Sequence, residues 1–580
     1  MHSTIILSLS LPKAPKIPET KFRVCCSWLI ELSLCIRKMK FMKLGSRPDT
    51  FFTEEATRAV MSDVPSDLTI KINNISYLLH KLQYPLLPKC GLLQRLYSEA
   101  DDATLELHDI PGGGEAFELC AKYCYGITIN LSAHNLVPSL CAAKFLRMTE
   151  AVEPGNLLIK LDSFFSSCIL QSWKDSIVTL NSTYSLFDWS QSLGIVRRCI
   201  DSIVDKILTP PNKVTWSYTY TRPGYDKTRR HQSVPRDWWT EDVSFLNVDM
   251  FRCILAAIKS ANALQPQLIG EALHVYASRW MPEIARDDDE ASTSREDEAK
   301  RRLLETVVSL IPAERGSVSF RFLLRLLSFA KVVAASPATK AELLRVAGQQ
   351  LEEATLNDLL LLPGRSGDES LYDVELIQTV LESFLRQWKR QVPIDERESM
   401  KSICKIGKLI DYYLQVVARD AGMTVQKMTS LAETLPGIAR PDHDHLYKAI
   451  NIYLKEHPDL SKADKKQLCR VLDCQKLSPE ICGHAVRNER LPLRTVVQVL
   501  YYEHEKANSN ACRKQASPDE TERGVPSTSR VHEKSNLLRP EPSFKVRGEV
   551  AESKNGRASV VELNSREKAL IRRISHKSHS

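Results

Sequence analysis

The sequence of 580 residues lacks an apolar run long enough to cross a membrane. A spanning helix needs about 20 apolar residues, whereas the longest candidate, residues 24–36, is shorter and carries Glu31. Residues 1–11 have neither the basic start nor the small-residue cleavage site of a secretory signal. The 15 cysteines are scattered through apolar helical patterns and do not form a disulfide framework. We therefore expect a cytoplasmic protein with reduced thiols.

The common signatures of catalysis and of metal binding are also missing. Residues 364–367 lack the Gly-x-Ser-x-Gly turn of serine hydrolases, and no glycine-rich loop ends in Lys-Ser or Lys-Thr. Cys469, Cys474, Cys482 and His484 are spaced more loosely than the cysteine pairs of structural zinc sites, and their spacing fits helical packing. We expect no enzymatic activity, no bound metal and no cofactor.

The net charge of +8 is concentrated at the two ends of the chain. Residues 506–580 hold 16 Lys and Arg against nine Asp and Glu, and residues 1–38 hold six against two, so the remainder is mildly acidic. A basic tail that binds nucleic acid needs stacking aromatic side chains, but Phe544 is the single aromatic residue of residues 506–580. We therefore expect no nucleic-acid partner and interpret the basic tail as a flexible or membrane-surface segment.

Hydrophobic periodicity predicts a small α/β unit near the N-terminus. Leu68, Ile70 and Ile72 alternate as in a half-buried strand, and apolar residues at helical spacing follow in residues 116–126 and 136–148. The apolar side chains of these two helical segments are expected to form core, namely Phe117, Leu119, Tyr123, Leu136, Leu140 and Leu146.

Most of the remaining chain has helical periodicity, as in Val374, Ile377, Val380 and Leu381. After residue 505, Ser, Pro and charged residues predominate, which predicts disorder, until an amphipathic basic pattern begins at Val560. We predict a multidomain, mainly α protein, with the following parts: an N-terminal extension at 1–38, an α/β domain at 66–165, a helical extension and linker at 166–235, an all-α domain at 236–505, and a disordered tail with a basic amphipathic end at 506–580.

The motifs of the α/β segment resemble those of a BTB/POZ domain. They are His80-Lys81, Phe117, the Tyr-Cys-Tyr-Gly of residues 123–126, and residues 140–148. The resemblance implies a protein–protein interaction domain that forms homodimers or heterodimers.

Five motifs of the helical region resemble the plant non-phototropic-hypocotyl domain of the NRL family. They lie at residues 235–242 (Pro-Arg-Asp-Trp-Trp-Thr-Glu-Asp), 268–276, 408–414, 446–458 and 488–500. The sequence that starts at Met39 also resembles the opening of that family, so we expect Met39 to be the working start and residues 1–38 to be either an N-terminal extension or a gene-model artefact that is not translated.

The resemblance implies a substrate-specific adaptor of a cullin-RING E3 ubiquitin ligase in plant signalling. The BTB domain would bind the cullin scaffold, and the helical domain would bind the protein substrate. The same family also implies an alternative, a plasma-membrane scaffold for blue-light receptor kinases or auxin transport. Relatives often carry a coiled coil after the helical domain, but residues 506–580 show no sustained heptads.

Two candidate phosphorylation sites come from the motifs. Arg572 and Arg573 precede Ser575 in the Arg-Arg-x-Ser pattern of basophilic kinases, and Lys568 extends this basic segment. These cations are expected to contact anionic lipid, and a phosphate on Ser575 would offset about two of their charges. The family resemblance adds a 14-3-3 protein as a reader of phosphorylated Ser575. Tyr413 resembles a residue in a family motif proposed for tyrosine phosphorylation, although an aromatic residue at this spacing also fits interior packing.

Overall fold

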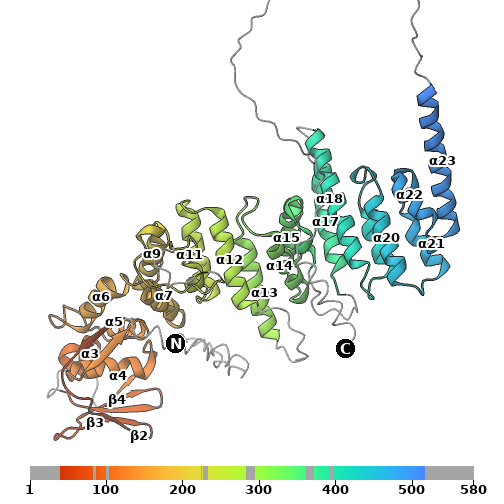
Figure 1. The fold of residues 1–580 in the computed structure, drawn as a ribbon. Coiled ribbons are helices and arrows are strands. Elements are labelled where there is room, and N and C mark those ends of the chain that lie inside the picture. The colour runs from red at the N-terminus through yellow and green to blue at the C-terminus, as the bar shows by residue number, and fades with distance from the viewer. Residues whose placement is uncertain are drawn as a thin grey trace, which may run out of the picture. The chain divides into compact units, whose positions relative to one another are not determined.

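The computed structural model describes residues 40–81, 86–99, 104–223, 225, 233–281, 294–360, 371–390 and 396–515 (Figure 1), with residues 294 and 507–515 described by their backbone alone. The chain divides into two compact units, residues 1–511 and 512–580. Almost all described residues belong to the first unit, and the account below concerns that unit.

Seven strands in the described part of the chain form two sheets near the N-terminus. Five strands lie in the order β2-β3-β5-β4-β6, and β1 pairs antiparallel with β7. Within the five-stranded sheet, β2–β3 and β4–β5 are antiparallel, while β3–β5 and β4–β6 are parallel. The strands are β1 (Phe41–Leu44), β2 (Phe51–Glu54), β3 (Thr57–Val60), β4 (Leu68–Ile72), β5 (Ile75–Leu79), β6 (Thr104–Leu107) and β7 (Ile129–Ser132).

Strand β4 follows the alternation that its sequence predicts. Leu68, Ile70 and Ile72 are buried, and Lys71 is exposed. The sheet nevertheless begins before the predicted domain start at residue 66, because β2 and β3 are hydrogen-bonded into it. Periodicity did not predict β2, since three of its four residues are exposed and no apolar alternation marks it.

Four helices complete this α/β unit: α2 (Leu86–Lys89), α3 (Gly91–Glu99), α4 (Gly113–Cys124) and α5 (Leu136–Phe145). The expected core residues on and beside α4 and α5 are buried, except for Leu119, which is half-buried. Phe117 lies edge-on against Tyr77 of β5, with 4.9 Å between ring centroids, so α4 is fixed against the sheet.

The helical part of the chain begins directly after this unit. Helix α5 contacts α6 (Leu157–Phe164), α7 (Trp173–Ser182) and α8 (Phe187–Ser192). Helix α9 (Ile195–Ile207) contacts both α7 and α11 (Val248–Ala261). Short turns of helix lie between these helices and in the following region, namely η1 (Phe165–Ile169), η2 (Thr183–Leu186), η3 (Pro211–Lys213), η4 (Leu351–Glu353), η5 (Gly437–Ala439) and η6 (Cys474–Lys476).

The described residues from 236 onward are helices and loops without strands, which confirms the predicted all-α region. The helices are α10 (Thr240–Val243), α11 (Val248–Ala261), α12 (Pro266–Trp280), α13 (Ser294–Ser309), α14 (Phe320–Val332), α15 (Pro337–Gln350), α16 (Leu356–Leu359), α17 (Val374–Arg390), α18 (Glu396–Val417), α19 (Val425–Thr434), α20 (Asp444–Glu456), α21 (Lys462–Arg470), α22 (Pro479–Val486) and α23 (Leu493–Gln515). Helix α23 continues past residue 505, where the tail was predicted to begin.

Side-chain caps fix where several of these helices start. Ser319, Ser336, Thr424, Ser461 and Ser478 each accept a hydrogen bond from a backbone N–H in the first turn of α14, α15, α19, α21 and α22, respectively. Such a cap satisfies one of the N–H groups that a helix start leaves without a partner.

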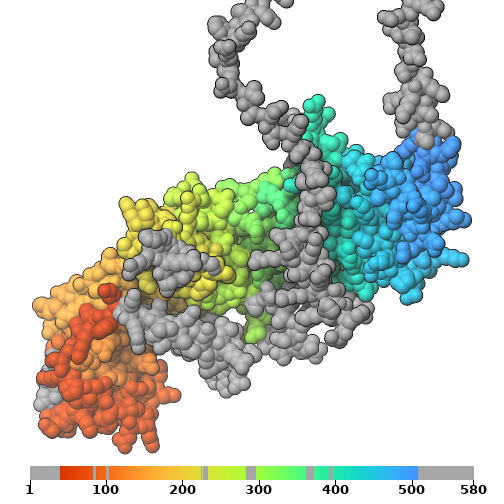
Figure 2. All heavy atoms as spheres, in the orientation of Figure 1, coloured from red at the N-terminus to blue at the C-terminus, as the bar shows by residue number. Residues whose placement is uncertain are grey.

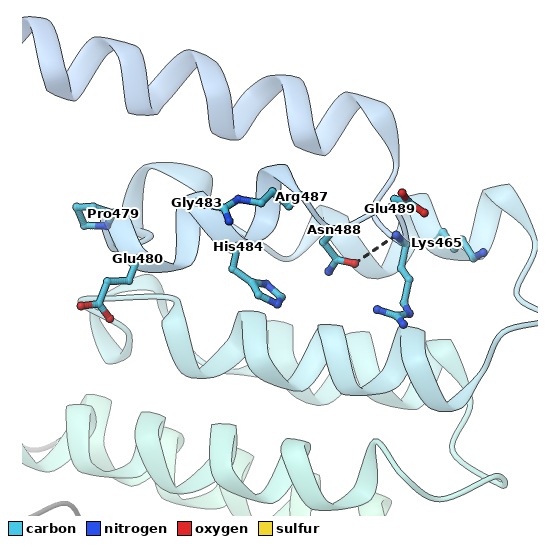
Figure 3. A pocket seen from close by; sticks show the side chains of 9 residues that line it. Lys465, Pro479, Glu480, Gly483, His484, Arg487, Asn488 and Glu489 are labelled. Carbon is cyan, nitrogen blue, oxygen red and sulfur yellow. Dashed lines mark hydrogen bonds between the residues drawn. The ribbon is translucent and has the colours of Figure 1, made fainter.

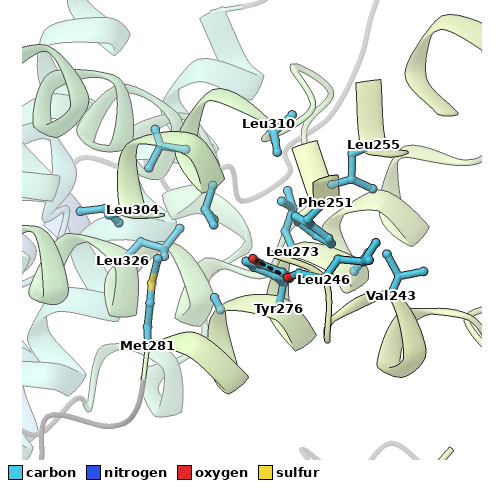
Figure 4. Packing of buried hydrophobic residues seen from close by; sticks show 14 of the residues in the cluster. Val243, Leu246, Phe251, Leu255, Leu273, Tyr276, Met281, Leu304, Leu310 and Leu326 are labelled. Carbon is cyan, nitrogen blue, oxygen red and sulfur yellow. Dashed lines mark hydrogen bonds between the residues drawn. The ribbon is translucent and has the colours of Figure 1, made fainter. Parts of the chain in front are cut away.

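Large apolar side chains fill the space between consecutive helices (Figure 4). Phe251 of α11 stacks on Tyr276 of α12, with 3.8 Å between ring centroids, and the Tyr276 hydroxyl donates to the Leu246 carbonyl at 3.0 Å. Helices farther along pack with the next but one, as α15 does with α17 and α18 with α20. No helix in the described ranges is long and apolar enough to cross a membrane.

Candidate protein-binding surfaces

The Trp-Trp-Thr-Glu-Asp motif binds a segment without helix or strand, residues 214–222, through ring packing and hydrogen bonds. We call this segment the strap. Trp238 is buried, and its ring lies edge-on against Trp173 of α7 at 4.7 Å and against Trp216 of the strap at 5.6 Å. Tyr218 packs on the same indole at 5.6 Å. The motif residue Trp238 therefore joins α7 to the strap and acts in packing.

Two buried carboxylates of α10 bind the backbone of the strap. Asp242 Oδ2 accepts from the Thr219 N–H at 3.0 Å and from the Trp173 indole N–H at 2.7 Å. Glu241 accepts from the Thr221 N–H at 2.8 Å and from its hydroxyl at 3.1 Å. The acidic end of the motif thus satisfies donors of a segment that pairs with no strand in the described ranges.

The BTB-like motif residue His80 also has a structural role. Its backbone N–H donates to the Tyr125 hydroxyl at 2.8 Å, and its Nε2 lies 2.9 Å from the Val64 carbonyl. These contacts tie the end of β5 to the residue that follows α4. His80 is buried and therefore stabilises the α/β unit.

Tyr413, the predicted tyrosine phosphorylation site, lies inside the helical region on α18. Its side chain is fully buried, its hydroxyl has no hydrogen-bond partner among the described residues, and burial raises the pKa of Tyr413. Phosphorylation at Tyr413 remains a prediction, and it would require α18 to open, whereas the neighbouring Tyr412 is exposed.

The other predicted site residues, Ser575, Lys568, Arg572 and Arg573, lie outside the described residues. The predictions of phosphorylation, lipid contact and 14-3-3 binding there remain predictions.

The cysteines of the loosely spaced group are buried in α21, η6 and α22. Burial raises the pKa of Cys469 to about 12 and that of Cys474 to about 11. His484 lies close in sequence, but its Nδ1 is hydrogen-bonded to the Tyr447 hydroxyl at 2.7 Å. Within the described ranges, no group of three or more His, Cys, Asp and Glu side chains could hold a metal ion.

His443 is a buried histidine that must stay neutral. Its Nδ1 accepts a hydrogen bond from the Asp473 N–H at 3.0 Å, so protonation would break this contact. Burial, with Arg440 and Lys476 nearby, lowers the pKa of His443 from 6.5 to about 4. Because the folded pKa is depressed, its contribution to stability is present above about pH 6.5 and is lost as the pH falls towards 4.

We predict that His443→Asn makes stability less sensitive to acid. The asparagine keeps an acceptor for the Asp473 N–H but does not titrate. Between pH 7 and pH 4.5, the free energy of unfolding should fall by up to about 3 kcal/mol more in the natural protein than in the variant. Urea unfolding at several pH values measures this difference, and parallel curves would contradict the assignment.

Exposed apolar side chains mark a first candidate contact surface on the α/β unit. Phe52 pairs with Ala59 across β2 and β3, and Met61 lies two residues beyond Ala59, so Phe52 and Met61 share one face of this hairpin. Phe52 is 42% exposed and Met61 is 70% exposed. β2 is also an edge strand of its sheet. We call Phe52 and Met61 the hairpin surface; the N-terminal strands are red in Figure 2.

A second apolar surface lies on α23. Leu493, Val497, Leu500 and Tyr501 recur at positions i, i+4, i+7 and i+8, which places them on one face of the helix, and they are 46–79% exposed. The opposite face packs inward through the buried Val499. We call these four residues the α23 face. A helix that is apolar on two faces contacts its own fold with one and offers the other to a partner.

A hollow of about 910 Å³ lies beside α21 and α22 (Figure 3). It is lined by Lys465, Pro479, Glu480, Gly483, His484, Arg487, Asn488, Glu489 and Arg490, and we call it the basic hollow. None of these three surfaces was predicted from the sequence. The spacing of Leu493, Val497, Leu500 and Tyr501 would have signalled the α23 face, whereas no local pattern signals the hollow.

Comparison with known proteins agrees with the fold and the motifs. The NPH3 family model matches residues 237–482. A BTB/POZ domain-containing protein of Arabidopsis thaliana is 56% identical over 516 residues, covering 87% of this chain and 92% of the relative. The phototropic-responsive NPH3 family protein NPY1 of the same plant is 41% identical over 493 residues, covering 81% and 82%. Root phototropism protein 3, also from Arabidopsis thaliana, is 35% identical over 579 residues, covering 80% and 77%.

No solved structure matches the chain. The resemblance stated from the motifs is confirmed by relatives that align over most of both chains. The protein belongs to the plant family that joins a BTB/POZ domain to an NPH3 domain.

Proposed function

We propose that the protein is a non-catalytic adaptor that brings protein targets to a cullin-RING E3 ubiquitin ligase. The BTB/POZ domain binds the cullin scaffold, and the NPH3 domain binds the target. One observation supports this division of roles above all. The hairpin surface and the α23 face expose large apolar side chains on elements far apart in the sequence, so one chain can hold two protein partners.

The hairpin surface is the proposed cullin contact. Clusters of exposed large apolar side chains are the usual anchors of protein interfaces, and truncating a central anchor costs at least about 2 kcal/mol of binding free energy. The edge position of β2 adds backbone groups on its outer side that have no neighbouring strand among the described residues.

We predict that the full-length protein retains a plant cullin in a pull-down and that Phe52→Ser with Met61→Ser weakens this retention at least about tenfold. The matched control is Phe187→Ser on α8, because Phe187 and Phe52 are both 42% exposed. Equal weakening by the control, or no cullin retention by the natural chain, would reject the ligase role.

The second candidate function is a signalling scaffold at the plasma membrane, acting near receptor kinases or auxin transport. It is supported by the basic segment with Lys568, Arg572 and Arg573, which would bind anionic lipid until Ser575 is phosphorylated and read by a 14-3-3 protein. In plant cells, deletion of the gene distinguishes the two functions. Unchanged ubiquitination of partners together with altered membrane recruitment would favour the scaffold.

A further inference from the structure

The basic hollow contains cations without ionic partners. Lys465 comes from α21, and Arg487 and Arg490 come from the turn between α22 and α23. In the part of the chain that the structure describes, none of these three side chains forms an ion pair. A volume of about 910 Å³ falls within the size of ligand-binding clefts, roughly 300–1,000 Å³.

A buried hydrogen-bond network under the hollow fixes the side chain of His484. The backbone N–H of Arg490 can only donate, and it lies 3.2 Å from Asn488 Oδ1, which sets the orientation of the Asn488 amide. The Asn488 Nδ2 group therefore donates to Asn451 Oδ1 at 2.8 Å and to the Tyr447 hydroxyl at 3.2 Å. Asn488 and Tyr447 are both buried.

The same network favours one tautomer of His484, the one that gives the Tyr447 hydroxyl hydrogen an acceptor. Because Tyr447 already accepts from Asn488, its own hydroxyl hydrogen has His484 Nδ1 as the available acceptor, at 2.7 Å. The neutral ring then carries its hydrogen on Nε2. His484 lines the hollow together with Lys465, Arg487 and Arg490, so its Nε2–H adds a donor to this lining. Arg487 lies near His484, and Lys465 lies farther along the row (Figure 3).

We propose that the basic hollow binds an acidic peptide segment of a protein partner, whose carboxylates accept hydrogen bonds from Lys465, His484 Nε2, Arg487 and Arg490. The inference rests on the proposed function, because it locates a contact for the protein that the NPH3 domain receives. Charge-assisted hydrogen bonds of this type are short and strong, and the His484 ring, which is held by the buried network, loses little entropy on binding.

The two glutamates of the hollow favour a peptide over a membrane surface. Glu480 lies near one end of the row of lining side chains, beside Pro479, and Glu489 lies near the other end, beside Lys465 (Figure 3). A uniformly anionic lipid surface would face both of these carboxylates and be repelled, whereas a peptide can place its acidic residues between them.

Fluorescence anisotropy with full-length protein tests the proposal. The probe is a fluorescein-labelled peptide of alternating Glu and Ser, compared with a peptide of alternating Gln and Ser. We expect only the Glu peptide to bind, and Arg487→Ala with Arg490→Ala to weaken binding at least about tenfold. Both arginines are exposed, so the variant should keep the unfolding temperature of the natural protein.

The matched control is a pair of neighbouring lysines on α21. Lys465→Ala should weaken binding of the Glu peptide, whereas Lys466→Ala should not, because Lys466 is exposed outside the hollow. Equal effects of the two substitutions, or equal affinity for the Glu and Gln peptides, would overturn the proposal.

Two further experiments distinguish this inference from its alternatives. In the first, vesicles containing phosphatidylserine replace the peptide. Binding to vesicles that depends on the arginines, without binding to the peptide, would assign the hollow to lipid. The second measures cullin retention by the natural protein. Peptide binding without cullin retention would reject the ligase role alone, and cullin retention without peptide binding would reject the hollow alone.

Discussion

Gly270→Ala is expected to destabilise the protein by about 3 kcal/mol of unfolding free energy, because a methyl group has no room at this position. An alanine Cβ built at Gly270 of α12 would lie 1.7 Å from the Ser317 carbonyl oxygen and 2.7 Å from its carbon. Both atoms belong to the backbone, so rotation of a side chain does not relieve the overlap. Natural domains are stable by about 5–15 kcal/mol, so this loss is a large fraction of the total.

Gly483→Ala is the matched control for Gly270→Ala. Gly483 also lies in a helix, α22, but nothing stands within 4 Å of its built Cβ. Alanine favours the helix over glycine by up to about 1 kcal/mol, so this substitution should be neutral or stabilising. Urea unfolding followed by circular dichroism compares the two variants. Similar midpoints for both would show that α12 and the segment around Ser317 are not in close contact.

Arg440→Ala is expected to have a comparable effect through a buried charge. The Arg440 Nε donates to Asp411 Oδ1 at 2.9 Å, and its Nη1 donates to the Ala432 carbonyl at 2.7 Å. Both charged side chains are buried, and burial raises the pKa of Asp411 even with the guanidinium beside it. Removing Arg440 leaves a buried carboxylate without its counterion, which typically costs about 3–5 kcal/mol.

The pH dependence and two further variants check this explanation. When the folded pKa of a carboxyl group is raised, the folded protein gains stability as that group binds a proton. The loss of unfolding free energy in Arg440→Ala should therefore shrink as the pH falls and Asp411 is protonated. Arg440→Met combined with Asp411→Leu should recover most of the loss, because no unpaired charge remains. The control is Arg345→Ala, which breaks the exposed pair with Glu342 and should cost less than about 1 kcal/mol. A similar loss for Arg345→Ala and Arg440→Ala would contradict the account.

The sequence predicted the elements whose apolar residues recur at a regular period. The alternation of Leu68, Ile70 and Ile72 identified the central strand β4, because both sides of that strand are hydrogen-bonded and one face is buried. The short edge strand β2 remained unpredicted, because its exposed residues carry no such pattern. Its position depends on hydrogen bonds with β3 and not on its own composition.

The candidate sites were harder to predict than the fold because they depend on contacts between distant residues. Tyr447 and His484 meet across α20 and α22, and no periodicity relates them. Motif recognition identified the Trp-Trp-Thr-Glu-Asp segment as a family signature, but its role became clear only from the strap backbone that Asp242 binds. The tail residues around Ser575 remain a prediction from sequence.

The strap has a consequence for how the chain can be divided. The loop that contains the strap is rich in Pro, Thr and Tyr, which suggests a boundary between the N-terminal and C-terminal parts of the chain. However, residues 214–222 cover Trp238, and their backbone N–H groups donate hydrogen bonds to Asp242 and Glu241. Proteolysis or truncation at residue 235 would separate the Trp238 indole from its aromatic neighbours and expose apolar surface on both fragments. We therefore expect gene fusions and natural splice variants to keep the strap in the same polypeptide as Trp238, Glu241 and Asp242.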